Sequence, residues 1–252
     1  MGFYDLSKVE REKLVNKIKA AITQDLQSGI SESIQKYAAD SDTYIRKNTY
    51  LILGKLYRDR QDMRTSILSV LHALFMNKDK KVRQTVVYAL GEVGKIDAEK
   101  VLDLFEETLN DPSLRNAIKG ALKQMGQKNP IYTIGFARKF LHHPDPKIRR
   151  EIIHGIELRG RTHPEDILPL LAEVQNNPHK EVRKIIIHVL SQISYKKSCL
   201  EKVVSALKKW ENKELVEDAL KEILEVHIRY AKFSAKSYNE VKAYVEQQFK
   251  SN

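Results

Sequence analysis

The chain has 252 residues, of which 42% are hydrophobic, enough to build the buried core of a folded protein. Its formal net charge of +11 favours an anionic partner or surface. The single cysteine, Cys199, excludes an internal disulfide and fits a reducing, cytoplasmic location. Early acidic residues argue against a signal peptide, and no apolar run is long enough to span a bilayer, so we expect no membrane partner.

Residues 1–40 are predicted to form a helical cap. Ser7 and Glu10 have the spacing of a capping box, in which each side chain satisfies a backbone amide at the start of a helix. Leu14, Ile18 and Ile22 then continue one apolar face at helical spacing. We therefore expect a long helix soon after the start of the chain.

From residue 41 onward a short unit recurs along the chain. It consists of a turn with Asp or Pro, then an aliphatic residue and an arginine, then apolar residues at the spacing of one buried helical face. The arginines lie 37, 32, 34 and 34 residues apart, and a sixth copy at Glu217 keeps this frame without the arginine. Self-similarity of this period is typical of a solenoid of helix pairs.

We predict an all-α fold, a right-handed α–α superhelix with about six helix pairs. The chain is expected to form a single domain, 1–252, with repeats over 41–226 and a closing helix within 227–252. No stretch alternates convincingly with a period of two, so we expect no sheet. The expected inner helices are Thr43–Tyr57, Lys81–Val93, Ser113–Met125, Lys147–Arg159, Glu181–Ile193 and Glu214–Val226.

The recurring unit resembles the HEAT repeat. This resemblance implies that the repeated arginine is structural and joins a ladder with the turn aspartate of a neighbouring unit. For Arg149, the expected partner is Asp111 or Asp145. The ladder residues predicted in this way are Arg46, Arg83, Arg115, Arg149 and Arg183.

Residues 138–223 are also similar to the alkylpurine DNA glycosylases of the AlkC/AlkD group, which act in DNA alkylation repair. The similarity lies in Ile148-Arg149-Arg150, Gly155, Arg159, Ile167-Leu168-Pro169-Leu170-Leu171, Asn177-Pro178, Val182-Arg183, Leu190, Ile193-Ser194, Trp210, Leu215-Val216 and Ala219-Leu220. It implies a basic concave groove that holds duplex DNA by its backbone. The residue before the glycine, acidic in that pattern, is His154 here, and the only tryptophan, Trp210, is expected in the core. Enzymatic activity is left open, with base excision not expected.

The positive charge is concentrated in one part of the chain. Residues 138–209 contain 15 basic and 8 acidic side chains. Cations aligned in successive repeats could meet several DNA phosphates, although basic side chains are also ordinary on solvated helix faces. The residues predicted to bind DNA are Lys47, Lys119, Lys123, Arg150, Arg159, Arg161 and Lys184.

Glu157 is the weak candidate for a catalytic carboxylate, because a glycosylase needs one to stabilise an oxocarbenium-like sugar or to orient water. Its alternative role is an ion pair with Arg150, Arg159 or Arg161. His154 and His188 occupy equivalent repeat positions, so their imidazoles could be neighbours and share a metal. We recognise no cysteine or carboxylate at ligand spacing beside them, and therefore predict polar packing, with no metal and no other cofactor.

Two functions follow from these features. The first is a monomeric, DNA-binding HEAT-repeat protein related to the alkylation repair proteins, which grips the duplex backbone in a basic groove. The alternative is a protein-interaction scaffold that binds an acidic or helical partner in the same groove. The salt dependence of duplex binding separates them, since phosphate contacts release counterions.

Overall fold

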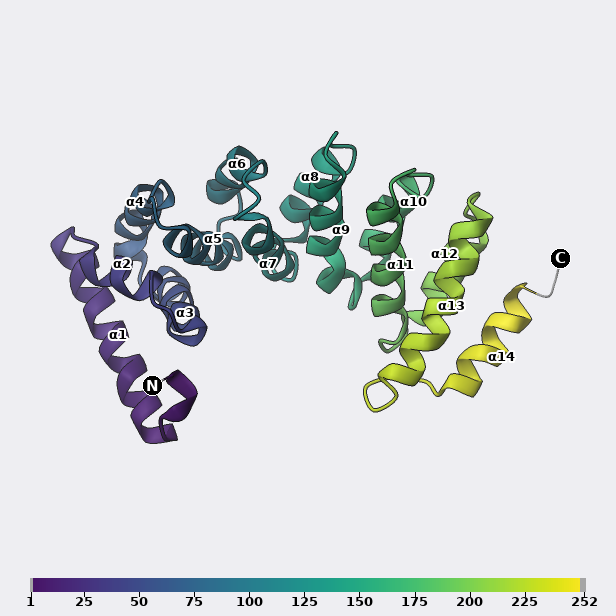
Figure 1. The fold of residues 1–252 in the computed structure, drawn as a ribbon, viewed down its shortest axis with the longest axis horizontal. Helices are drawn as coiled ribbons and strands as arrows, with labels where there is room; N and C mark the ends of the chain where they lie inside the picture. The colour runs from purple at the N-terminus through teal and green to yellow at the C-terminus, as the bar shows by residue number, and fades with distance from the viewer. Residues whose placement is uncertain (1, 250–252) are drawn as a thin grey trace. The chain divides into compact units, whose positions relative to one another are not determined.

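The computed structural model describes residues 2–249, and every regular element in that range is a helix (Figure 1). The predicted all-α class is therefore confirmed. The chain divides into two compact units, Met1–Asn129 and Pro130–Asn252, which we describe separately. No helix within residues 2–249 combines the length and apolar character that crossing a membrane requires.

The first unit begins with the expected cap. Its elements are η1 (Phe3–Asp5), α1 (Lys8–Ser28) and α2 (Glu32–Ala38). The capping box is confirmed: the Ser7 amide donates to Glu10 Oε2 at 2.8 Å, and the Glu10 amide donates to Ser7 Oγ at 3.3 Å. Helix α1 ends at Gly29, whose φ of +70° lies in the left-handed region that glycine adopts at low cost.

The rest of the first unit consists of paired helices. One layer holds α3 (Thr43–Asp59), α5 (Lys80–Gly94) and α7 (Arg115–Met125), and the connecting elements are η2 (Gln61–Met63), α4 (Arg64–Phe75) and α6 (Glu99–Thr108). Helix α5 packs against both α3 and α7. Gly91 allows the second of these approaches, because a Cβ added there would lie 2.6 Å from the Ala121 Cβ.

The second unit repeats this arrangement (Figure 1). Its inner layer holds α9 (Pro146–Gly160), α11 (Lys180–Ser194) and α13 (Lys213–Arg229), and its outer layer holds α8 (Pro130–Phe140), α10 (Pro164–Glu173) and α12 (Leu200–Lys208). The last helix, α14 (Tyr238–Phe249), packs against both α12 and α13. Helix α11 packs between α9 and α13, and α10 contacts both α8 and α12. All six inner helices predicted from the repeat overlap the observed ones.

The apolar positions of the repeat form the core of each unit. In the second unit, Ile152 and Ile156 of α9 and Ile186 and Leu190 of α11 are at most 1% exposed. Trp210 is buried as expected. Cys199 is also buried, and burial raises the pKa of its thiol.

Arg83 and Arg183 contact acidic residues of the following repeat. Arg83 Nη2 lies 3.1 Å from Asp111 Oδ2, a turn aspartate of the kind expected. Arg183 Nη2 instead reaches the next inner helix, with Asp218 Oδ2 at 2.8 Å and Glu214 Oε1 at 3.1 Å. These contacts link successive helix pairs.

Further arginines of the series donate to backbone carbonyls. Arg46 donates to the backbone carbonyl of Asp40 at 2.6 Å, within its own turn, and Arg115 Nε donates to the Leu109 carbonyl at 3.3 Å. Arg149 was expected to contact a turn carboxylate. Its Nε and Nη2 atoms are instead buried without a hydrogen-bond partner in the described part of the chain. One repeat position therefore supports several arrangements.

Candidate functional site

The second unit has a groove on its inner face, between α9 and α11. The groove has a volume of about 420 Å³ and is lined by Arg150, His154, Glu181, Lys184, Ile185 and His188. The 34-residue repeat explains the pairing of these side chains, since it places equivalent residues of α9 and α11 side by side. Arg150 thus corresponds to Lys184, and His154 to His188.

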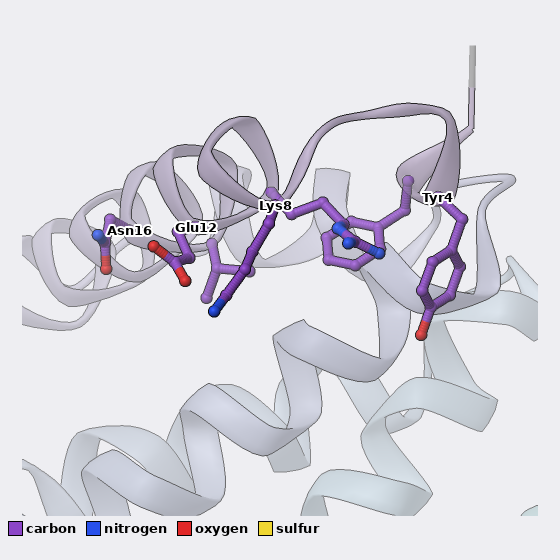
Figure 2. Close-up of a pocket in the computed structure, with 7 residues that line it drawn as sticks. Tyr4, Lys8, Glu12 and Asn16 are labelled. Atoms are coloured by element: carbon purple, nitrogen blue, oxygen red, sulfur yellow. The ribbon is translucent and has the colours of Figure 1, made fainter.

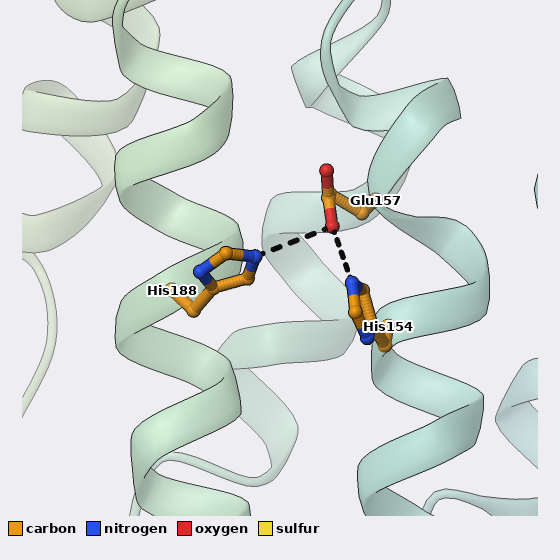
Figure 3. A group of neighbouring side chains, drawn as sticks. All are labelled: His154, Glu157 and His188. Atoms are coloured by element: carbon orange, nitrogen blue, oxygen red, sulfur yellow. Dashed lines mark ion pairs between the residues drawn. The ribbon is translucent and has the colours of Figure 1, made fainter. Parts of the chain in front are cut away.

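A buried carboxylate lies beside the two histidines of this groove (Figure 3). Glu157 is only 2% exposed, and its Oε2 atom is 3.0 Å from His154 Nε2 and 3.6 Å from His188 Nε2. The centroids of the two imidazole rings are 5.4 Å apart, and the rings meet edge to face. The prediction that no carboxylate lies near these histidines was wrong, because residues three apart in a helix share one face.

The other carboxylate oxygen of Glu157 has a cationic partner. Arg161 Nη2 donates to Glu157 Oε1 and also, at 2.8 Å, to Gln192 Oε1 on α11. The Arg161 guanidinium carbon lies 5.9 Å from the centroid of the Tyr195 ring. Sequence reasoning missed Gln192 and Tyr195, although they follow His188 by four and seven residues and so continue its helical face.

The four cations predicted to bind DNA in the second unit have different surroundings. Arg150 and Lys184 are exposed and line the groove. Arg150 also donates to Glu151 at 2.9 Å. Arg159 donates to Asp166 on α10 at 2.7 Å, and therefore turns toward the outer layer. Arg161 engages Glu157, so Arg150 and Lys184 are the members of this set that face the groove.

The remaining three predicted DNA contacts belong to the first unit. Lys47 lies on α3 and lines a small cavity of about 180 Å³, together with the stacked rings of Tyr50 and Tyr88, whose centroids are 5.1 Å apart. Lys119 lies on α7 and donates to Asn116 Oδ1 at 2.8 Å. Lys123 lies one turn further along the same helix.

Two of the larger hollows of the first unit lie near α1 and α3. One, of about 390 Å³, lies between α3 and α5 and is lined by Leu51, Gly54, Lys55, Arg58, Glu92, Lys95, Ile96 and Lys128. The other, of about 450 Å³, lies at the start of α1 and is lined by Phe3, Tyr4, Lys8, Arg11, Glu12, Val15 and Asn16 (Figure 2). Tyr4 is 60% exposed there, and Arg11 lies over its ring at 5.1 Å. Neither hollow brings a buried carboxylate together with imidazoles.

The α9–α11 groove therefore combines exposed cations with a buried acid. A catalytic carboxylate has to reach its substrate, whereas both oxygens of Glu157 already contact Arg161 or an imidazole. This observation supports the alternative role for Glu157, an ion pair with Arg161. Chemically, the groove offers cationic side chains for an anionic ligand, and two imidazoles that lie beside a buried carboxylate.

Several solved structures are similar to this chain. A protein named smu.31, from Streptococcus mutans UA159, is 18% identical, with a TM-score of 0.50 over 74% of this chain and 97% of that one. The HEAT-like repeats protein of Thermococcus onnurineus NA1 is 17% identical, with a TM-score of 0.40 over 86% and 98%. A chain of the Pds5–Scc1 complex is 12% identical, with a TM-score of 0.48 over 95% and 38%. No curated protein matches the sequence.

The sequence itself matches a model of HEAT repeats over residues 30–126 and 135–225, well over half of the chain. The two matched ranges overlap every helix from α2 to α13. They also contain all five of the repeated arginines. The chain therefore belongs to the HEAT-repeat family.

Proposed function

We propose that this protein is an interaction scaffold that binds an acidic segment of a partner protein in the α9–α11 groove. One observation carries the proposal. Arg150 and Lys184 extend from neighbouring inner helices beside the apolar side chain of Ile185, and all three line one groove. Such a surface offers charge pairing and apolar contact to the same ligand.

The distribution of charge favours a protein segment over duplex DNA. A duplex carries a charge about every 1.7 Å along its axis and is best met by a continuous row of cations. In this unit, Arg159 and Arg161 engage Asp166 and Glu157, and a further acid, Glu181, lines the groove itself. A segment with separated acidic residues fits this mixed lining better than a uniform polyanion.

Fluorescence anisotropy of a labelled, Glu- and Leu-rich helical peptide tests the proposal with the full chain. Reversing two charges, Arg150→Glu with Lys184→Glu, should weaken binding at least about tenfold. A tenfold change corresponds to about 1.4 kcal/mol of binding free energy. The matched control, Lys202→Glu with Lys208→Glu, changes the net charge equally on the outer helix α12 and should bind like the wild type. Equal loss in both double variants would show attraction by net charge alone and would contradict a specific groove.

Duplex DNA is the second candidate, favoured by the net charge of +11. A labelled duplex in the same assay separates the two functions. Each phosphate contact contributes about −0.9 to the slope of log K against log salt, so contacts from Arg150 and Lys184 alone would give about −2. Duplex binding that is tighter than peptide binding, with a steeper slope, would favour the DNA-binding function. Release of an alkylated base that is lost in Glu157→Gln would additionally establish the glycosylase.

A further inference from the structure

We propose that His154, Glu157 and His188 form a binding site for one divalent transition-metal ion, of which zinc is the best match. The three side chains each offer one donor atom, and these atoms lie within 4.8 Å of one another (Figure 3). Two imidazoles and one carboxylate are the ligands of many zinc sites and of other first-row metal sites. Calcium and magnesium prefer all-oxygen sites, so the two nitrogens disfavour them.

The spacing of the donor atoms suits a shared ion. Zinc lies about 2.0–2.1 Å from imidazole nitrogen and about 2.0–2.2 Å from carboxylate oxygen, so two tetrahedral ligands are about 3.4 Å apart. The distances from Glu157 Oε2 to the two Nε2 atoms are 3.0 and 3.6 Å. The His188 side chain is 43% exposed and can rotate. A small rotation would bring its Nε2 atom from 3.6 Å to the distance of about 3.4 Å that two tetrahedral ligands require.

The surroundings hold the carboxylate in place. Arg161 binds Oε1 of Glu157 and leaves Oε2 directed toward the two imidazoles. Gln192 accepts a second hydrogen bond from Arg161, which ties this support to α11. Metal-ligating carboxylates are commonly held by hydrogen bonds of this kind, and their loss typically weakens metal binding 10–100-fold. The ligands also come from two packed helices, so little ordering is needed on binding.

The histidines line the groove, and three protein ligands leave at least one coordination position for water or an external ligand. Arg150 and Lys184 line the same groove and would favour an anion there. A carboxylate of the bound acidic segment would supply such a ligand. This last step rests on the proposed function, whereas the metal site itself does not.

The test is a titration of the EDTA-treated, dialysed full-length protein with metal alone. Co²⁺ binding is followed by visible absorption, and Zn²⁺ is added afterwards as a competitor. We expect one Co²⁺ per chain, displaced by Zn²⁺, with binding that weakens toward pH 5 because protons compete for the imidazoles. His188→Ala should lower the affinity at least about 100-fold, whereas His142→Ala, an exposed histidine of the same unit, should leave it unchanged.

His188 is partly exposed, so its substitution should preserve folding, which circular dichroism verifies. Glu157→Gln removes another of the three metal ligands. Arg161→Gln removes the hydrogen bond that holds the Glu157 carboxylate in place but keeps all three ligands. The proposal is overturned if Co²⁺ binds no more tightly than about 1 mM, or if His188→Ala binds it like the wild type. Because no peptide is present, this result is independent of the peptide assay, which is run separately with EDTA.

Discussion

Arg161 and Glu157 form an ion pair beside the two histidines of the α9–α11 groove, with the carboxylate 2% exposed and the arginine side chain 25% exposed. The pair joins two helices, because Arg161 also donates to Gln192 of α11. A carboxylate this deeply buried would be costly without a compensating cation. The ion pair therefore explains how the unit tolerates an acidic residue in its core.

Replacing this carboxylate by an amide, Glu157→Gln, should destabilise the fold. The amide has nearly the same shape but no charge, so Arg161 loses a charged hydrogen bond in a partly buried position. Such bonds contribute about 1.5–3 kcal/mol, and we expect the free energy of unfolding to fall by about that amount. Urea denaturation at neutral pH, in EDTA, measures the change.

Glu165→Gln is the matched control. Glu165 pairs with Lys202, but both side chains are about half exposed, and the pair is well screened by solvent. We expect no measurable change in the midpoint of this variant. Equal stability of Glu157→Gln and the wild type would show that the buried ion pair contributes nothing net.

A second prediction concerns the approach of α5 to α7. Gly91→Ala should destabilise the first unit, because the new Cβ would lie 2.6 Å from the Ala121 Cβ and 2.8 Å from its Cα. Overpacking of this kind costs about 1–3 kcal/mol. Gly135→Ala, on α8, meets nothing within 4 Å and should stabilise by about 0.4–1 kcal/mol, since alanine restricts the unfolded chain. Thermal unfolding of both variants checks these opposite signs.

The fold was predictable because one signal recurs along the chain. Each copy of the repeat pairs a turn with the same apolar spacing. A helix that is ambiguous in one copy can therefore be assigned from the neighbouring copies. Ser7 and Glu10 also marked the start of α1 correctly, since a capping box depends only on local residues. Periodicity and capping are both short-range, and they determine most of an all-helical fold.

The site was less predictable, because its contacts depend on which way each side chain turns. Arg159 and Arg161 are two residues apart, yet one meets Asp166 of the outer layer and the other meets buried Glu157. Repeat alignment correctly made neighbours of His154 and His188. It gave no sign that Glu157 is buried beside them, because an acidic residue on a basic stretch is usually assigned to the surface.

The unlike partners of the repeated arginines give a third prediction. Arg183→Met should cost about 0.5–1 kcal/mol, because it removes the contacts to Asp218 and Glu214, whose side chains are partly to mostly exposed. Arg149→Met should leave the free energy of unfolding unchanged or raise it. This substitution removes two buried nitrogens that lack partners among residues 2–249 and keeps most of the aliphatic length. Urea denaturation measures the free energy of unfolding of both variants. A larger loss of stability in Arg149→Met than in Arg183→Met would contradict this account.

The last prediction is a pH dependence that arises from His227 on α13. The ring is 1% exposed, and its Nδ1–H donates to the Ile223 carbonyl at 2.7 Å. Burial lowers the pKa of His227, because it penalises the charged imidazolium. In the unfolded chain, the ordinary histidine pKa is about 6.5. Below that pH the unfolded state binds a proton that the folded state does not, so stability is lost as pH falls from about 6.5 through the lowered pKa.

Urea denaturation at about pH 8, 6.5 and 5 measures this effect as a difference between variants. One proton changes the free energy of unfolding by at most about 1.4 kcal/mol per pH unit. His227→Leu should lose less stability than the wild type between the two lower pH values, whatever its stability at pH 8. His142→Gln, which replaces an exposed histidine, should follow the wild type. If His227→Leu and the wild type lost stability in parallel, the buried imidazole would not be a source of acid sensitivity, and the proton uptake would have to occur elsewhere in the chain.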